Sequence, residues 1–217
     1  MDEAAVKAQV ISHIRQAKKR RSPVITAELT LGTSGARADI AVLSDAELIG
    51  LEIKTERDSL RRLLAQIEAY SRYFDQVVVV AAPCHLAQLA KLDLFGASVW
   101  RADKSGITPV STGTVNTVSV SAYLDLMTNQ EKKQVAEKSD LTVREHYFDI
   151  FARRYGQTSL ALWQSVAGRK IKADDVRLLS RFNERRVAIQ MIAQERQDRW
   201  KIWQDAYAGM RTDACLT

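Results

Sequence analysis

Apolar and polar positions follow helical spacing at the start of the chain and strand spacing soon after. Val6, Val10, Ile11 and Ile14 recur with the period of a helix, which predicts a helix over residues 3–17. Extended segments are predicted over 24–33, 37–43 and 47–54. Only a short connection separates the last two segments, so we expect them to form an antiparallel hairpin.

A Val-rich run then covers residues 77–82 and ends at Pro83. Strands that are apolar on both faces are typical of the middle of a parallel sheet, and the helix predicted over 59–74 supplies the crossover into it. A second helix, ended by Gly96, and a closing hairpin are predicted over 85–95, 97–102 and 107–111. This order of elements predicts an α/β fold in which a mixed β-sheet is flanked by helices.

The last third of the chain has a different pattern. Residues 112–121 are uncharged and rich in Ser, Thr, Val and Gly, which indicates a linker or loose hairpin. Helices are predicted from there on, broken at Gly156 and Gly168, over 122–137, 140–155, 158–167 and 174–208. The sequence therefore predicts a core over 1–121 and an all-α region over 122–217, and we expect Trp163, Trp200 and Trp203 to pack this region onto the core.

Charge changes the picture because its excess is not evenly spread. The chain of 217 residues has a formal net charge of +6, of which residues 141–217 carry +5 through 14 Lys and Arg against 9 Asp and Glu. A basic surface suits a polyanion such as nucleic acid, although a solvated helix face has the same composition. The basic run Lys18, Lys19, Arg20 and Arg21 is open to the same two interpretations, phosphate contact or an exposed helix end.

Other compositional features exclude several classes of protein. Cys84 and Cys215 are isolated thiols, which predicts a reducing, cytoplasmic location and neither a disulfide framework nor a cysteine metal site. No apolar stretch approaches the roughly 18 residues of a membrane span, and residues 1–17 do not resemble a signal peptide. The sequence contains no phosphate-binding loop of the Walker type and no nucleophile elbow.

The candidate chemistry lies between Arg37 and Tyr70. Side chains two apart in a strand share a face, so Arg37 pairs with Asp39 and Glu52 pairs with Lys54. If the two strands are neighbours, one carboxylate from each strand and an ammonium converge. Clustered carboxylates repel each other, and a hard cation with oxygen ligands, such as Mg²⁺, relieves that repulsion.

The run Asp39 … Glu52-Ile53-Lys54 resembles the core of the PD-(D/E)XK nuclease superfamily, with Ala38 where many members have Pro. Glu28 matches an additional acidic residue of many members. Gln66 and Tyr70 match the Gln-x-x-x-Tyr element of the RecB-like branch. More narrowly, residues 37–70 together with 179–186 are similar to the bacterial sce7726 family of uncharacterised proteins.

This resemblance implies a restriction-endonuclease-like core and a Mg²⁺-dependent nuclease, with Mn²⁺ as a substitute, that hydrolyses phosphodiester bonds in DNA. The implied catalytic residues are Asp39, Glu52, Lys54, Glu28, Gln66 and Tyr70. The implied metal ligands are Asp39, Glu52, Glu28 and the backbone carbonyl of Ile53. Lys54 would orient the attacking water or neutralise developing charge, Gln66 and Tyr70 would hold the site in place, and Arg37 would bind a neighbouring phosphate.

Two rival interpretations remain open at the level of sequence. In the first, a nuclease-like fold binds nucleic acid or a protein partner without cutting. In the second, Glu52 and Lys54 form a surface ion pair worth under about 1 kcal/mol. Many members of the superfamily act as dimers, but nothing in the sequence decides between a monomer and a homodimer.

Overall fold

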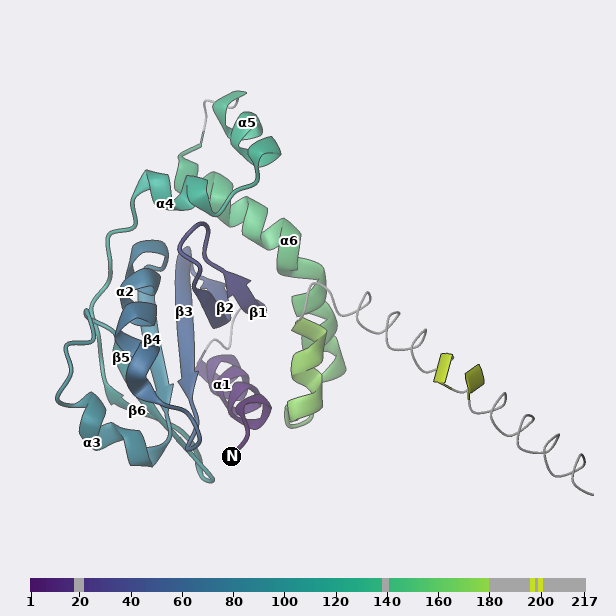
Figure 1. Cartoon of the computed structure of the whole chain (residues 1–217). Helices are drawn as coiled ribbons and strands as arrows, with labels where there is room; N and C mark the ends of the chain where they lie inside the picture. The colour runs from purple at the N-terminus through teal and green to yellow at the C-terminus, as the bar shows by residue number, and fades with distance from the viewer. Residues whose placement is uncertain (18–21, 138–140, 180–195, 198, 201–217) are drawn as a thin grey trace, which may run out of the picture. The chain divides into compact units, whose positions relative to one another are not determined.

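The computed structural model describes residues 1–17, 22–137, 141–179, 196–197 and 199–200. The chain divides into two units, Met1–Arg181 and Phe182–Thr217, and the elements below all belong to the first. That unit has the predicted α/β fold, a mixed sheet flanked by helices (Figure 1). The basic run at 18–21 and Trp203 lie outside the described residues.

The sheet has six strands in sequential order. They are β1 (Val24–Thr30), β2 (Arg37–Ser44), β3 (Glu47–Lys54), β4 (Gln76–Ala81), β5 (Ser98–Asp103) and β6 (Gly106–Ser111). The pairs β1–β2, β2–β3 and β5–β6 are antiparallel, whereas β4 pairs parallel with both β3 and β5. The predicted hairpins and the central parallel strand are thus confirmed.

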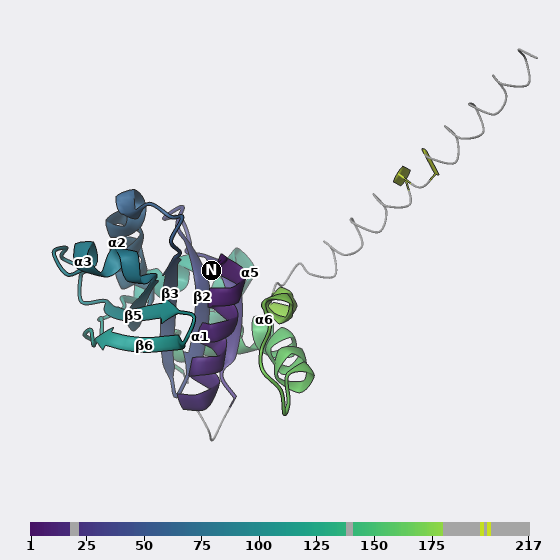
Figure 2. The same ribbon diagram turned by 90° about the horizontal axis from the view of Figure 1, so that it is seen from below.

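Helices cover both faces of the sheet, as the two views show (Figures 1 and 2). On one face lie η1 (Leu60–Arg62), α2 (Leu63–Tyr73), η2 (Pro83–His85) and α3 (Leu86–Leu89). The other face carries α1 (Glu3–Ala17). The helix predicted over 85–95 is wrong beyond Leu89, because the chain there leaves helical geometry in a series of turns and Asp93 accepts a hydrogen bond from Phe95 N–H.

The remaining helices are α4 (Val120–Asp125), α5 (Asn129–Glu137), α6 (Val143–Ser165) and η3 (Ala173–Leu179). α6 begins with a capping box in which Thr142 and Glu145 satisfy each other's backbone N–H groups. It runs through Gly156 without a break, so the predicted break there is wrong. The described residues form two hydrophobic cores, one beneath α2 and one beneath α1 (the α1 core). The cost of a helical glycine, about 1 kcal/mol, is outweighed because Tyr155 is buried in the first core and Leu162 in the second.

α6 lies along the β1 edge of the sheet and protects it. The Ser159 hydroxyl accepts a hydrogen bond from Ile25 N–H and lies 2.8 Å from the Ile25 carbonyl oxygen. The Trp163 indole donates to the carbonyl of Pro23, and its ring packs against the α1 core as the sequence predicted. Trp200 belongs to the second unit. An edge strand covered in this way does not offer its backbone to another chain.

Candidate active site

The candidate site lies at the carboxyl end of β3, where α2 covers the sheet. Leu51 and Ile53 of β3 pack in the core beneath α1. Glu52 and Lys54 point to the opposite face, as alternation predicts. The Lys54 Nζ lies 2.7 Å from Glu52 Oε1, and the two side chains are only 9% and 3% exposed. The pair is therefore buried, which excludes the interpretation of a surface ion pair.

Two residues of α2 hold this ion pair in place. Gln66 Oε1 accepts a hydrogen bond from Lys54 Nζ at 3.0 Å. The buried Tyr70 hydroxyl donates to the second oxygen of Glu52, and it also lies 2.7 Å from the carbonyl oxygen of Arg37. Burial and the Glu52 charge raise the pKa of Tyr70 well above its ordinary value, so its hydroxyl stays protonated and remains a donor. The spacing of Gln66 and Tyr70 thus brings both to β3.

Asp39 joins this group from the neighbouring strand. Its Oδ2 accepts a hydrogen bond from Ile53 N–H at 2.7 Å, which anchors its carboxylate to the β3 backbone at the residue between Glu52 and Lys54. Burial, followed by the negative charge of Glu52, raises the pKa of Asp39 to about 7. A carboxyl group shifted in this direction is one for which ionisation is costly beside a second carboxylate.

Glu28 lies opposite Asp39 in the β1–β2 pairing, since Ala27 pairs with Ile40 and Leu29 with Ala38. Its backbone has φ +59, a left-handed conformation that is strained in a residue with a side chain. Arg37 Nη1 lies 3.6 Å from Glu28 Oε2, which places Arg37 beside the site.

A divalent cation fits the donor set formed by Asp39 and Glu52. Both are oxygen ligands. Burial and, after it, the Glu52 charge raise the pKa of Asp39, and a bound cation would offset both effects by favouring the ionised carboxylate. Within the part of the chain that the structure describes, no group of three or more His, Cys, Asp or Glu is placed to share a metal ion. The fit is therefore to a pair of carboxylates, and the roles of Glu28 and the Ile53 carbonyl as ligands stay predictions.

Comparison with known proteins places the chain in a family. The family model for bacteriophage P4 protein cII matches residues 1–180. The chain belongs to the bacteriophage P4 protein cII family. It is 29% identical over 89 residues to protein cII of Enterobacteria phage P4, a match that covers 41% of this chain and 33% of the relative. The match thus spans about a third of the length of that curated relative.

A structural likeness extends over more of this cII-family chain but is weak. The SPO1766 protein of unknown function from Silicibacter pomeroyi is similar at a TM-score of 0.44 and 17% identity, covering 70% of this chain and 91% of the other. A likeness at this level supports no inference about fold or function. The resemblance to PD-(D/E)XK nucleases accordingly stays a prediction.

One residue that lies beside the site in this cII-family chain was not identified from the sequence. Lys7 of α1 is only 5% exposed, and its Nζ lies 2.6 Å from Glu3 Oε1 and 4.0 Å from Glu28 Oε1. Its positive charge also lowers the pKa of Asp39 against the larger effects that raise it. A signal was present, because Lys7 falls one turn before Ile11, on the apolar stripe of the predicted helix where a charged residue is unusual.

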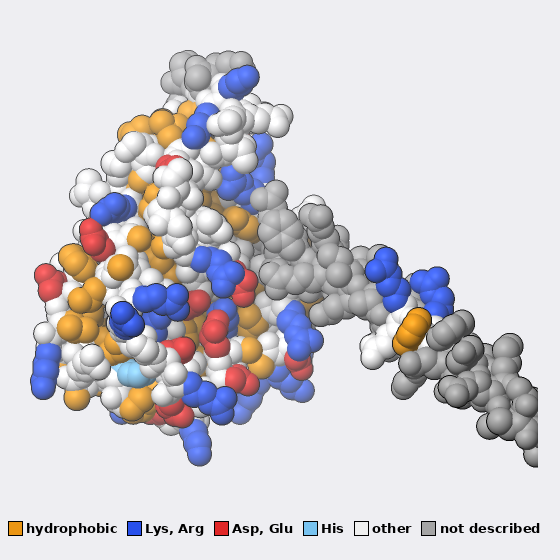
Figure 3. Space-filling model, in the orientation of Figure 1, with side chains coloured by type: hydrophobic (Ala, Val, Ile, Leu, Met, Phe, Trp, Pro, Cys, Tyr) orange, Lys and Arg blue, Asp and Glu red, His pale blue; other side chains and the backbone are white. Residues whose placement is uncertain are grey.

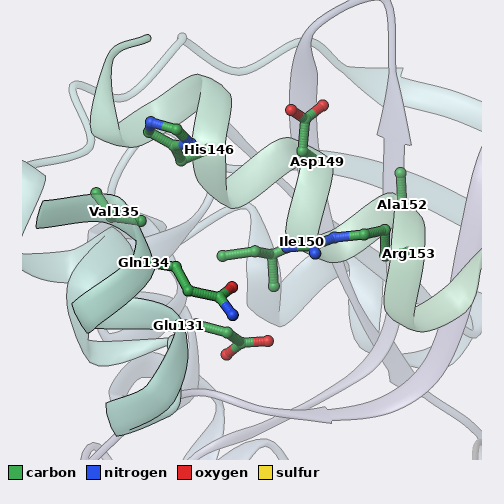
Figure 4. Close-up of a pocket in the computed structure, with 8 residues that line it drawn as sticks. All are labelled: Glu131, Gln134, Val135, His146, Asp149, Ile150, Ala152 and Arg153. Atoms are coloured by element: carbon green, nitrogen blue, oxygen red, sulfur yellow. The ribbon is translucent and has the colours of Figure 1, made fainter. Parts of the chain in front are cut away.

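A separate pocket lies between α5 and α6 (Figure 4), lined by Glu131, Gln134, Val135, His146, Asp149, Ile150, Ala152 and Arg153. Glu131 also accepts hydrogen bonds from Arg154 and Thr128 N–H. None of the predicted catalytic residues lines this pocket. Among the helices that the structure describes, none is long and apolar enough to cross a membrane.

Proposed function

We propose that this cII-family chain is a metal-dependent nuclease that hydrolyses phosphodiester bonds in DNA. The observation that carries the proposal is the buried Glu52–Lys54 pair at the end of β3, with the half-buried Asp39 of β2 held against the backbone of the residue between them. Burying an ion pair costs desolvation energy that well-packed apolar side chains would not incur, so such a pair is weak evidence for a stabilising role. Positioned acids and an amine in a desolvated site are common in catalysis.

The residues divide the work as their contacts suggest. Asp39 and Glu52 would hold Mg²⁺, which when bound activates water and stabilises negative charge on the phosphoryl group. Lys54, held by Glu52 and Gln66, is oriented to donate to the attacking water or to a charged oxygen. Tyr70 fixes the Glu52 carboxylate by donating to it. The resemblance to PD-(D/E)XK nucleases supports the same roles, and the isolated thiols suit a cytoplasmic enzyme.

A second candidate is a nuclease-like module that binds nucleic acid without cutting it. The observation in its favour is that both oxygens of Glu52 are already engaged, one by Lys54 and one by Tyr70. A metal at Glu52 would have to share those oxygens with the two donors. The two candidates differ in whether bound DNA is cut.

The test incubates plasmid and short labelled duplexes with the protein and Mg²⁺ or Mn²⁺, and repeats the reaction with EDTA. The variants Asp39→Asn and Lys54→Gln remove one site group each. Glu68→Gln is the matched control, because Glu68 is exposed and its ion-pair partner among the described residues is Arg72 on the same exposed face of α2. Circular dichroism confirms that each variant is folded.

We expect cutting by the wild type and by Glu68→Gln with Mg²⁺, and none with EDTA. The two site variants should be slower by about 100-fold or more, the usual effect of removing one charge-stabilising group. DNA that is retained but never cut would support the binding module instead. Cutting that persists in Asp39→Asn would refute the assigned site.

A further inference from the structure

Three arginines in the segment that joins β3 to α2 have free guanidinium groups. Arg57, Arg61 and Arg62 are exposed, and their side chains make no ion pair or hydrogen bond with the residues that the structure describes. Eight of the twelve described arginines in the first unit are engaged, namely Arg15, Arg37, Arg72, Arg101, Arg144, Arg154, Arg169 and Arg177. Arg153 of α6 also lacks such a partner among the described residues, but its arginine neighbours on that helix, Arg144 and Arg154, are paired.

The acidic residues of the same segment do not neutralise these arginines. Asp58 accepts hydrogen bonds from the Thr55 N–H and hydroxyl at 2.7 and 2.6 Å, which lowers the pKa of Asp58. Glu56 lies 3.4 Å from the N-terminal amine of Met1. Among the described residues, neither carboxylate forms an ion pair with these arginines, so the three guanidinium groups stay available at the surface.

The segment is held next to the candidate site. It begins directly after Lys54, and the Ser59 hydroxyl accepts from Arg61 N–H at 3.1 Å, which fixes the start of η1. Arg62 precedes Gln66 by one helical turn, and Gln66 binds Lys54. The face over α2 and α1 shows Lys and Arg side chains gathered close to Asp and Glu side chains (Figure 3).

We propose that Arg57, Arg61 and Arg62, together the arginine rim, bind backbone phosphates of the DNA strand that enters the site. The inference rests on the proposed function, which makes a phosphodiester backbone the occupant of the adjoining site. A guanidinium group presents a planar fork of donors that matches phosphate oxygens. Because the group is weakly hydrated, little hydration free energy is lost when it contacts a phosphate. Contacts of this kind fix the strand without reading its sequence.

The test measures binding of a labelled duplex by fluorescence anisotropy across a series of salt concentrations. It is run in EDTA, where no hydrolysis is expected, and again with Ca²⁺. The rim variant carries Arg57→Gln, Arg61→Gln and Arg62→Gln. The matched control carries Arg72→Gln, Arg153→Gln and Arg177→Gln, so it loses the same net charge from exposed positions away from the rim.

We expect the rim variant to lose affinity by about tenfold or more and its salt slope to fall by roughly 2 to 3, since each phosphate contact contributes about 0.9. The control should stay close to the wild type. A rim variant that binds like the wild type, a control that loses as much, or a wild type that binds no duplex would overturn the inference.

These outcomes are separable from those of the nuclease assay. A protein that binds DNA through the rim and cuts nothing with Mg²⁺ or Mn²⁺ would keep the inference and refute the proposed hydrolysis. A protein that cuts DNA as fast without the rim as with it, and binds it as tightly, would keep the hydrolysis and refute the inference.

Discussion

Two tyrosines of α2, three positions apart, each donate a hydrogen bond to a carboxylate, and the two carboxylates are in opposite situations. Tyr73 donates to Asp125 at 2.7 Å, and Thr33 donates to the same oxygen from its N–H at 2.8 Å and its hydroxyl at 3.1 Å. Tyr70 donates to Glu52, which stands beside Asp39. The first carboxylate accepts from Tyr73 and Thr33, whereas the second accepts from Tyr70 and Lys54 and also has a second acid, Asp39, beside it.

The pKa values of Asp125 and of Asp39, the acid beside Glu52, shift in opposite directions. The Thr33 N–H and then the Tyr73 hydroxyl hold the pKa of Asp125 below its ordinary value. Burial and Glu52 instead raise the pKa of Asp39 to about 7. A carboxylate supplied with donors ties a loop to two helices and stabilises the fold, while a crowded pair costs stability until a cation arrives.

The largest expected effect is at Gly32, next to Asp125. A Cβ added there would lie 2.0 Å from Asp125 Oδ2, and the residue has φ +49. Gly32→Ala should therefore both strain the backbone and displace the carboxylate, at a cost of about 2 to 4 kcal/mol in the free energy of unfolding. Urea unfolding measures it.

Gly35→Ala is the control for Gly32→Ala. Gly35 also has positive φ, +72, but a Cβ there meets nothing within 4 Å. It should cost about 1 kcal/mol from strain alone. Equal losses in the two variants would show that the Asp125 contact contributes nothing.

Asp125→Asn should lower the free energy of unfolding by a smaller amount, about 1 kcal/mol at pH 7. The loss is small because the site is partly exposed and a neutral amide still accepts hydrogen bonds. Since the folded pKa of Asp125 is lowered, its contribution is present above the unfolded pKa, near 4, and is lost as pH falls through the folded value. The difference in unfolding free energy between wild type and variant should vanish in acid. A difference that is constant down to pH 2 would contradict this interpretation.

Asp39→Asn should change the free energy of unfolding in the opposite direction, by raising it, and its effect should be the smallest of these. The folded pKa of Asp39 is raised, so the metal-free wild type gains stability as pH falls from above 7 toward 4 and loses it as pH rises. In EDTA at pH 8 the variant should be more stable by up to about 1 kcal/mol, and the gap should close below pH 7. A loss of stability at pH 8, measured by thermal or urea unfolding, would mean that Asp39 is a structural residue.

The sequence predicts the site of Asp39 and Glu52 better than the hydrogen-bonded site of Asp125. Alternation along β3 is enough to put Glu52 and Lys54 on one face, and the helical spacing of Gln66 and Tyr70 brings both over that face. The signal for Lys7 is weaker, a single charged residue on the apolar stripe of α1. The contact of Thr33 with Asp125 joins a loop to a helix 92 positions away, and no local pattern in the sequence specifies such a pairing.

The prediction of helices failed for a similar reason. Gly156 breaks the local pattern, but packing against both cores overrides its low helix propensity, so a single helix α6 forms. Conversely, the residues after Leu89 have acceptable helix propensity and still leave the helix. Tertiary packing explains the first case, whereas local turns and the hydrogen bond from Phe95 N–H to Asp93 accompany the second.

The central claim is that Asp39 and Glu52 together hold a divalent cation. The most direct test titrates the protein with Mn²⁺ in the absence of DNA and measures binding by calorimetry or electron paramagnetic resonance. Wild type and Asp125→Asn should bind Mn²⁺ equally, and Asp39→Asn should bind it at least about tenfold more weakly, since it removes one of two charged ligands. Equal Mn²⁺ binding by wild type and Asp39→Asn, or no binding by the wild type, would contradict the account.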